Sequence, residues 1–180
     1  MGLVRGAANG FELYRGATRA EAVTMLIRLL NEETLATEGE FTHHFTDVDA
    51  WANKIVAYAL HKGYANGVSS NKFGASSPTT VNHYMTFLLR ALGYNDTAGD
   101  FKWDSAMEAA VKYGVITEDE RLWISSTPFY RDHMVYLSYY ALQANMKGAD
   151  KTLLESLVER GAVSSTKAKN AIDSVSRVRG

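Results

Sequence analysis

Three stretches of this chain are variants of one unit, and this internal repetition constrains its fold more than any other feature. The two clearest copies of the unit's second half lie at residues 18–30 and 80–92, and a weaker copy lies at residues 130–142. The copies recur at intervals of roughly 50 to 60 residues, a spacing typical of supersecondary units that stack because none can bury its apolar face alone. We therefore expect functional residues at the seams between units.

Composition excludes several classes of function. The 180 residues suit one compact domain, and a net charge of −1 without a basic cluster argues against a nucleic-acid or acidic-membrane partner. The chain has no cysteine, which excludes disulfides, thiol catalysis and thiolate metal ligands. No apolar run approaches the roughly 20 residues that span a bilayer. The first residues lack the apolar segment of a signal peptide, so the chain either is cytoplasmic or has been cut from a longer exported precursor, and its start favours the second.

The second unit is the most complete and predicts two helices joined by a glycine-rich loop. The apolar spacing in residues 51–62 predicts a helix of about 12 residues. Either Asp47 or Asp49 is a suitable N-cap residue, and Gly63 is a suitable C-terminal stop. Turn-forming residues fill the segment 66–74.

The same pattern predicts the remaining elements. The second unit's second helix starts after Thr80 and ends at Gly93. Further helices are expected over residues 103–114, 131–142, 153–158 and 165–175, the last capped by Ser165. Residues 32–40 and 95–100 are expected to be polar connectors, and residues 118–120 a solvated turn. Because no convincing alternating pattern appears, any sheet should be minor.

The repeat boundaries follow from this alignment. We expect a single domain over residues 1–180, with repeats at 1–40, 41–98 and 99–180. Residues 2–6 align with residues 63–67, so the first repeat lacks its opening helix, and the last helix of the third repeat's C-terminal extension could fill that place.

Several spaced motifs carry a resemblance to a known family. They lie at residues 18–21 (Thr-Arg-Ala-Glu), 45–52, 63–67, 72–73, 88–94 and 99–103. In this order they resemble the S-layer homology (SLH) domain of Gram-positive surface proteins, over nearly the whole chain. The resemblance implies a mainly α fold, in which three helix-loop-helix repeats form a pseudo-threefold spindle around a central helical bundle. Two extra C-terminal helices would follow.

The resemblance also implies a function. In the family, grooves between repeats bind secondary cell-wall polysaccharide linked to peptidoglycan, often through pyruvylated N-acetylmannosamine. The chain would then be a secreted, extracellular, non-covalent anchor in the cell wall or S-layer, fused or bound to a surface-layer protein or an exoenzyme. It would need no cofactor or metal and would not insert into a membrane. The alternative is a structural or protein–protein interaction module with this fold that has lost sugar binding.

Arg19 is the strongest candidate for ligand binding. Thr18 and Glu21 form a capping box and are expected to be structural, whereas Arg19 places a cation where the helix dipole disfavours it. A guanidinium beside free N-terminal amides suits a carboxylate such as a pyruvyl ketal; the alternative is an ordinary surface salt bridge. Arg131 aligns with Arg19, but Val81 stands in the second unit, so at most two grooves should be competent.

The other candidate ligand-binding residues each have a structural alternative. Trp51 and Trp103 could stack on a sugar or pack in the core. Asp47 could contact sugar or cap a helix. Gly67 and Gly6 would let the backbone approach a ligand closely, although turn geometry also explains them.

No pattern in the sequence nominates an enzyme. The pair His43-His44 lies near two aspartates, but adjacent histidines on an extended loop point apart and no complementary ligand cluster follows. A glycosidase needs two carboxylates roughly 5 to 9.5 Å apart in a cleft, and no spacing nominates such a pair. We therefore expect a binding protein without catalytic residues or a metal site.

Overall fold

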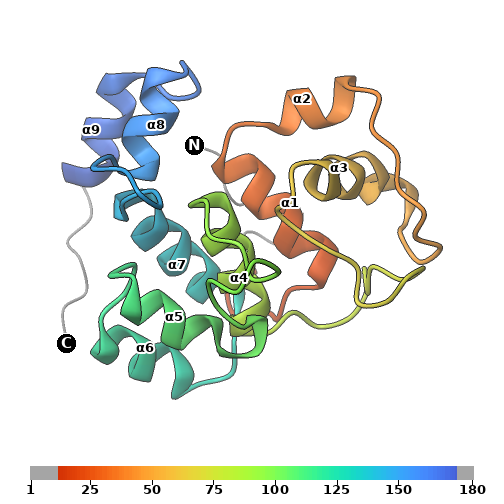
Figure 1. Cartoon of the computed structure of the whole chain (residues 1–180), viewed down its shortest axis with the longest axis horizontal. Helices are drawn as coiled ribbons and strands as arrows, with labels where there is room; N and C mark the ends of the chain where they lie inside the picture. Colours follow the sequence, from red (N-terminus) through yellow and green to blue (C-terminus); the bar gives the residue numbers. More distant parts are fainter. Residues whose placement is uncertain (1–11, 174–180) are drawn as a thin grey trace.

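The computed structural model describes residues 12–173 and is mainly helical, as the sequence predicts (Figure 1). The helices are α1 (Arg19–Leu29), α2 (Glu33–Glu38), α3 (Ala50–His61), α4 (Val81–Ala91), α5 (Ala106–Lys112), α6 (Glu118–Ser125), α7 (Arg131–Gln143), α8 (Leu153–Glu159) and α9 (Ser165–Asp173), with a 3-10 turn, η1 (Trp103–Ser105), before α5. Between residues 12 and 173, β-pairing is confined to isolated bridges, so the expectation of little sheet is confirmed.

Local signals set the helix ends. The Thr18 side chain accepts the N–H of Glu21, and the Glu21 carboxylate accepts the N–H of Thr18, which completes the expected capping box. Helix α4 begins with a similar box, in which His83 takes the place of the glutamate. Gly63 and Gly93 follow their helices with φ of 70° and 96°, a conformation in which a side chain is strained.

Three helices form the centre of the molecule (Figure 1). Helices α1, α4 and α7 contact one another, and they correspond to the predicted second helices of the three units. Helix α3 packs on α1, and α5 packs on α4. Each of these helices contributes a fully buried leucine to the core, namely Leu26, Leu88 and Leu137. Each unit thus buries its apolar stripe against its neighbours. The threefold symmetry and the repeat boundaries stay predictions.

Two segments differ from the sequence expectation. The connector at residues 32–40 contains the short helix α2, whose Ala36 is fully buried against the rest of the core. The acidic residues 118–120 are the first turn of α6, not a solvated turn, and Glu120 is 97% buried through its capping box with Thr117. Carboxylates favour a helix N-terminus, because they complement its dipole.

The C-terminal helices form the expected extension. Helix α8 packs on α7, and α9 packs on α8. Ser165 is the first residue of α9, and Val175 lies outside the described residues. The turn between these helices reaches the first unit, where Asn31 donates to the carbonyl of Ala162 at 2.8 Å. Whether the last helix replaces the missing one stays a prediction.

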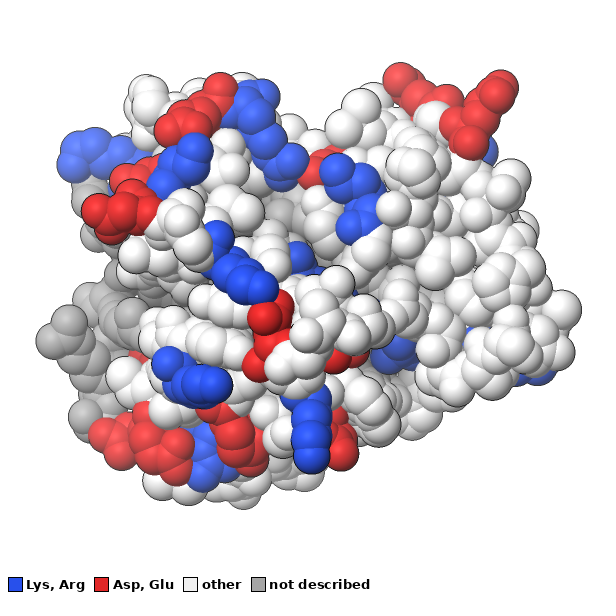
Figure 2. Space-filling model, viewed as in Figure 1, with Lys and Arg blue, Asp and Glu red and all other residues white. Residues whose placement is uncertain are grey.

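The face drawn in Figure 2 carries charges of both signs. Figure 2 shows positive and negative side chains interspersed over α6 and α8, whereas the right-hand part of this face is mostly uncharged apart from an acidic cluster at its upper edge, near α2. Among the helices between residues 12 and 173, none combines the length and the apolar character needed to cross a membrane.

Candidate functional site

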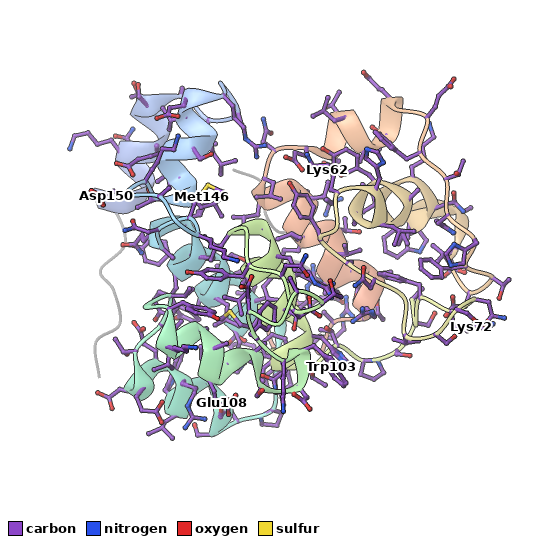
Figure 3. All side chains as sticks on the ribbon, viewed as in Figure 1. Lys62, Lys72, Trp103, Glu108, Met146 and Asp150 are labelled. Carbon is purple, nitrogen blue, oxygen red and sulfur yellow. The ribbon has the colours of Figure 1, made fainter. Side chains whose placement is uncertain are left out.

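A cavity of about 310 Å³ lies where the first two units meet the start of the third. Helix α1, the loop of the second unit, helix α4 and the segment that leads into α5 all contribute to its walls. Its lining residues are Arg19, Asn66, Gly67, Val68, His83, Thr86, Phe87, Arg90, Asp96 and Trp103. Figure 3 shows Trp103 at the edge of α4, with Lys72 distant at the tip of the loop. The structure therefore brings three of the sequence candidates together: Arg19, Gly67 and Trp103.

Arg19 is a buried cation in the wall of this cavity. Arg19 is only 7% exposed, and its Nη2 donates to the carbonyl of Asn66 at 2.9 Å. The guanidinium carbon lies 5.1 Å from the ring centre of Phe73 and 4.9 Å from that of Phe87, within cation–π range. Burial, with a contribution from the charge of Arg90, lowers the pKa of Arg19 to about 10. The side chain therefore remains charged at neutral pH.

The charge of Arg19 has no anionic partner among the described residues. Its Nε is buried without a hydrogen bond, and no carboxylate in the described residues lies within salt-bridge distance of the guanidinium. Arg19 is therefore not the ordinary surface salt bridge that the sequence left open. A buried cation without a counter-ion is unfavourable unless a ligand supplies the missing charge.

The expectation of free N-terminal amides beside Arg19 is wrong. The N–H of Arg19 donates to the carbonyl of Ser77 at 2.9 Å, and that of Ala20 to the carbonyl of Ala75 at 3.0 Å. The next amide belongs to the capping box. The loop of the second unit thus satisfies the start of α1, since buried backbone donors are rarely left unpaired. At the start of α1, the group that remains available to a ligand is therefore the guanidinium of Arg19, not the backbone amides.

Arg90 is a second cation in the wall, and sequence reasoning missed it. Its Nε and Nη2 donate to the two carboxylate oxygens of Asp96, each at 2.8 Å. The side chains of Arg90 and Asp96 are 9% and 10% exposed, so this bidentate pair is rigid and nearly neutral. A signal was present, because Arg28 and Arg90 occupy the same place in the apolar runs of the two clearest repeats.

Trp103 forms an exposed aromatic edge of the cavity. It is 55% exposed, and its ring stacks on that of His83 with centres 5.7 Å apart and planes at 26°. Nδ1 of His83 accepts the N–H of Thr80 at 3.4 Å, which holds the imidazole at the start of α4. Trp103 is therefore not a core residue, which was one of its two predicted roles. Its indole is free to present one face and an N–H to a ligand.

Trp51 and Arg131 lie at a different seam, around Glu21. Trp51 is 57% exposed and borders a smaller cavity of about 180 Å³ that Glu21 and Asp49 also line. Arg15 holds the Glu21 carboxylate with two hydrogen bonds, and the charge of Arg131 also acts on it. Burial raises the pKa of Glu21, but these interactions together with its capping bond outweigh burial and lower it.

The two seams place similar residues in the same arrangement, but they differ in the charge of the third residue of the helix. Glu21 is the third residue of α1, and His83 is the third residue of α4. Each neighbours an exposed tryptophan, and each feels the charge of an arginine, Arg131 or Arg19. Where the Arg19 cavity has a histidine, the second seam has a carboxylate.

Two other candidates have structural contacts of their own. The Asp47 carboxylate accepts the N–H groups of Phe73 and Gly74, each at 2.8 Å, so it holds the loop and does not cap α3, whose N-cap residue is Asp49. A Cβ on Gly67 would lie 2.5 Å from the ring of Phe45, so packing there requires glycine. Gly6 lies outside the described residues.

Comparison with known proteins relates the chain to bacterial surface proteins, although no family model matches it. It is 29% identical over 110 residues to a middle cell wall protein of Brevibacillus brevis and 30% identical over 110 residues to a surface layer protein of Brevibacillus choshinensis, in each case over 59% of this chain. It is 34% identical over 89 residues, or 48% of the chain, to a cell surface protein of Thermoanaerobacter kivui. The matched parts make up 10%, 10% and 12% of these longer relatives.

Proposed function

We propose that this chain is an extracellular, non-covalent cell-wall anchoring module of the SLH type, which binds an acidic secondary cell-wall polysaccharide in the Arg19 cavity. The observation that carries the proposal is the buried Arg19 guanidinium, whose Nε has no hydrogen bond and which lines an open cavity beside an exposed indole. The similarity to cell wall and surface layer proteins supports a location at the cell surface.

The cavity has the chemistry that an acidic sugar needs. A guanidinium fork matches the geometry of a carboxylate, and a charge-assisted hydrogen bond in such a site contributes about 1.5 to 3 kcal/mol. The exposed face of Trp103 offers apolar area to a sugar ring. A volume of about 310 Å³ is at the small end of ligand pockets, and suits one or two sugar units of a polymer. We infer that a pyruvylated amino sugar supplies the carboxylate.

The second seam is a weaker candidate within the same proposal. Arg131 lies 3.8 Å from the carboxylate of Glu12, so its charge is partly compensated. Glu21 would repel an acidic ligand near Trp51. We infer that the Arg19 cavity is the principal site and that Arg131 contributes a second, weaker one.

One observation favours the alternative of a structural module without sugar binding. The guanidinium of Arg19 lies over the two rings of Phe73 and Phe87, and it also holds the carbonyl of Asn66. These contacts alone could make Arg19 a clamp between α1, α4 and the loop of the second unit. The two functions differ in what a change at Arg19 does to wall binding.

The test is sedimentation of the protein with purified cell walls before and after chemical removal of the secondary polymer. We expect binding that disappears with the polymer, and that Arg19→Gln weakens about tenfold or more, the effect of about 1.4 kcal/mol. The matched control is Arg28→Gln, on the same helix, whose partly exposed pair with Glu33 lies outside the cavity. Absence of binding to every wall preparation, with the fold intact, would favour the structural module.

A further inference from the structure

The Arg19 cavity contains a titratable group that the proposed function does not use. Of the chain's five histidines, His83 alone is among the residues that line it. Its ring is fixed on two sides, by the stacked indole of Trp103 and by the N–H of Thr80, which Nδ1 accepts. Since Nδ1 is the acceptor, the proton of the neutral ring is assigned to Nε2.

We propose that His83 is a further ligand-binding residue of this cavity, that it donates from Nε2 to the acidic group held by Arg19, and that the ligand is bound together with a proton. This inference rests on the proposed function, because it concerns the same acidic ligand. It adds a specificity for anionic over neutral sugars and a dependence of affinity on pH.

The charges around His83 support proton uptake. Facing it are Arg19 on α1 and Arg90 on α4, the latter already neutralised by Asp96, while Asp104 follows Trp103 in η1. Burial lowers the pKa of His83, and the charge of Arg19 lowers it further. An anion between the two would cancel that repulsion and favour the imidazolium. By linkage, whatever raises the pKa on binding makes binding tighter as pH falls.

The opposing effect is the loss of the cap. An imidazolium cannot accept the N–H of Thr80 at Nδ1. This contact is 3.4 Å long at His83, whereas the corresponding one from Tyr130 to His133 in α7 is 3.1 Å. The longer hydrogen bond at His83 is the weaker of the two, so protonation of Nδ1 breaks it at a lower cost than at His133.

The experiment is calorimetric titration at pH 7.5 and pH 5.5 with a disaccharide that carries pyruvylated N-acetylmannosamine, and with the same disaccharide without the ketal. A pyruvyl carboxylate stays ionised in this window, since α-carboxyl groups titrate near pH 3 to 4. We expect the dissociation constant of the acidic disaccharide to fall about threefold to tenfold at the lower pH, because one unit of pKa difference corresponds to tenfold. The neutral disaccharide should bind weakly at both.

The variants separate the charge from the fold. His83→Gln keeps an acceptor at the third helical position and completes a capping box, but it cannot be protonated, so its affinity should not vary with pH. His133→Gln makes the same change in α7, at a residue that does not line the cavity, and should keep the wild-type pH dependence. NMR titration of the His83 ring should show its pKa rising when the acidic disaccharide saturates the protein.

The outcomes are distinguishable. Tight binding that is equal at both pH values, a pH dependence that persists in His83→Gln, or a His83 pKa that does not move on saturation would each overturn the role of His83 while leaving the anchoring proposal intact. No binding of the acidic disaccharide at either pH, together with no binding to walls, would overturn both.

Discussion

Arg160 Nη1 lies 2.6 Å from Glu32 Oε1, and this contact joins the C-terminal extension to the end of α1. Glu32 is 98% buried, and the Tyr64 hydroxyl also donates to it at 3.4 Å. A second bond runs from Arg160 Nη2 to the carbonyl of Leu30 at 3.0 Å. The pair therefore holds together segments that are far apart in the sequence, and Glu32 would be a buried carboxylate without its cation if Arg160 were removed.

We expect Arg160→Met to lower the free energy of unfolding by about 1 to 3 kcal/mol, because it leaves that carboxylate unpaired. Adding Glu32→Gln to the same protein should recover part of the loss, since the remaining side chain is neutral. Urea denaturation of the two single variants and the double variant gives the coupling energy. Strictly additive losses would show that the two side chains do not interact in solution.

Asp47→Asn tests the support of the loop that carries Phe73. Burial raises the pKa of Asp47, but the N–H groups of Phe73 and Gly74 outweigh it, so the folded pKa lies below the ordinary value. The carboxylate therefore contributes stability above about pH 4, and this contribution is lost as pH falls through the folded pKa. We expect a loss of about 1 to 2 kcal/mol at pH 7. The difference from wild type should shrink in acid, and thermal unfolding between pH 7 and pH 3 measures it.

Arg19→Met should separate stability from binding. Burial lowers the pKa of the folded Arg19 guanidinium to about 10, well below its value in the unfolded chain, so the charged form opposes folding, and fully so below about pH 10. A methionine of similar length can pack between Phe73 and Phe87 without this penalty. We expect the free energy of unfolding at pH 7 to rise by about 1 to 3 kcal/mol while wall binding is lost.

The stability difference between Arg19→Met and wild type should depend on pH. Because burial lowers the pKa of Arg19 to about 10, we expect the charged fraction of folded Arg19 to fall above that pH and the advantage of Arg19→Met to diminish. Guanidinium chloride denaturation at pH 7 and pH 10.5 checks the sign. A marked loss of stability in Arg19→Met would instead identify the arginine as the structural clamp of the alternative function.

Local patterns predicted most of the helices, because their signals lie within a few residues of each other. The apolar spacing of residues 51–62 predicts α3. The glycines that follow α3, α4, α5 and α8 mark where these helices end. The prediction of a solvated turn at the start of α6 is wrong, because charge at Glu118 and Asp119 favours a helix N-terminus as well as solvation. Short helices such as α2 are held by tertiary packing, which periodicity does not report.

The sequence nominated Arg19, Gly67 and Trp103, yet it could not group them. The arginine of each unit predicts one groove per unit, whereas the cavity combines Arg19 of the first unit with α4 and the loop of the second and with Trp103 at the start of the third. The stacking of His83 on Trp103 and the pairing of Arg90 with Asp96 depend on how chain segments pack, so local spacing does not reveal them. The order of the units around the central helices decides which residues share a seam.

Arg131→Gln should affect polymer binding less than Arg19→Gln does. Arg131 is partly compensated by Glu12 and lies beside the Glu21 carboxylate, so its seam attracts an anion weakly. We expect the dissociation constant for the acidic disaccharide at the principal site to be unchanged, and binding to whole walls to fall at most a few-fold through lost avidity. Calorimetry and wall sedimentation measure these separately. Equal losses for both arginine variants would show two equivalent sites.

Trp103→Ala, compared with Trp51→Ala, tests whether the exposed indole contacts the sugar. The two residues are 55% and 57% exposed, so removing either should cost little stability, and they border different seams. An aromatic contact beyond simple burial contributes about 0.5 to 1.5 kcal/mol, so Trp103→Ala should weaken disaccharide binding by about twofold to tenfold, and Trp51→Ala by much less. Calorimetric titration of both variants checks this, with circular dichroism as the control for folding. If Trp51→Ala causes the larger loss, the principal site lies at the seam of Glu21 and not in the Arg19 cavity.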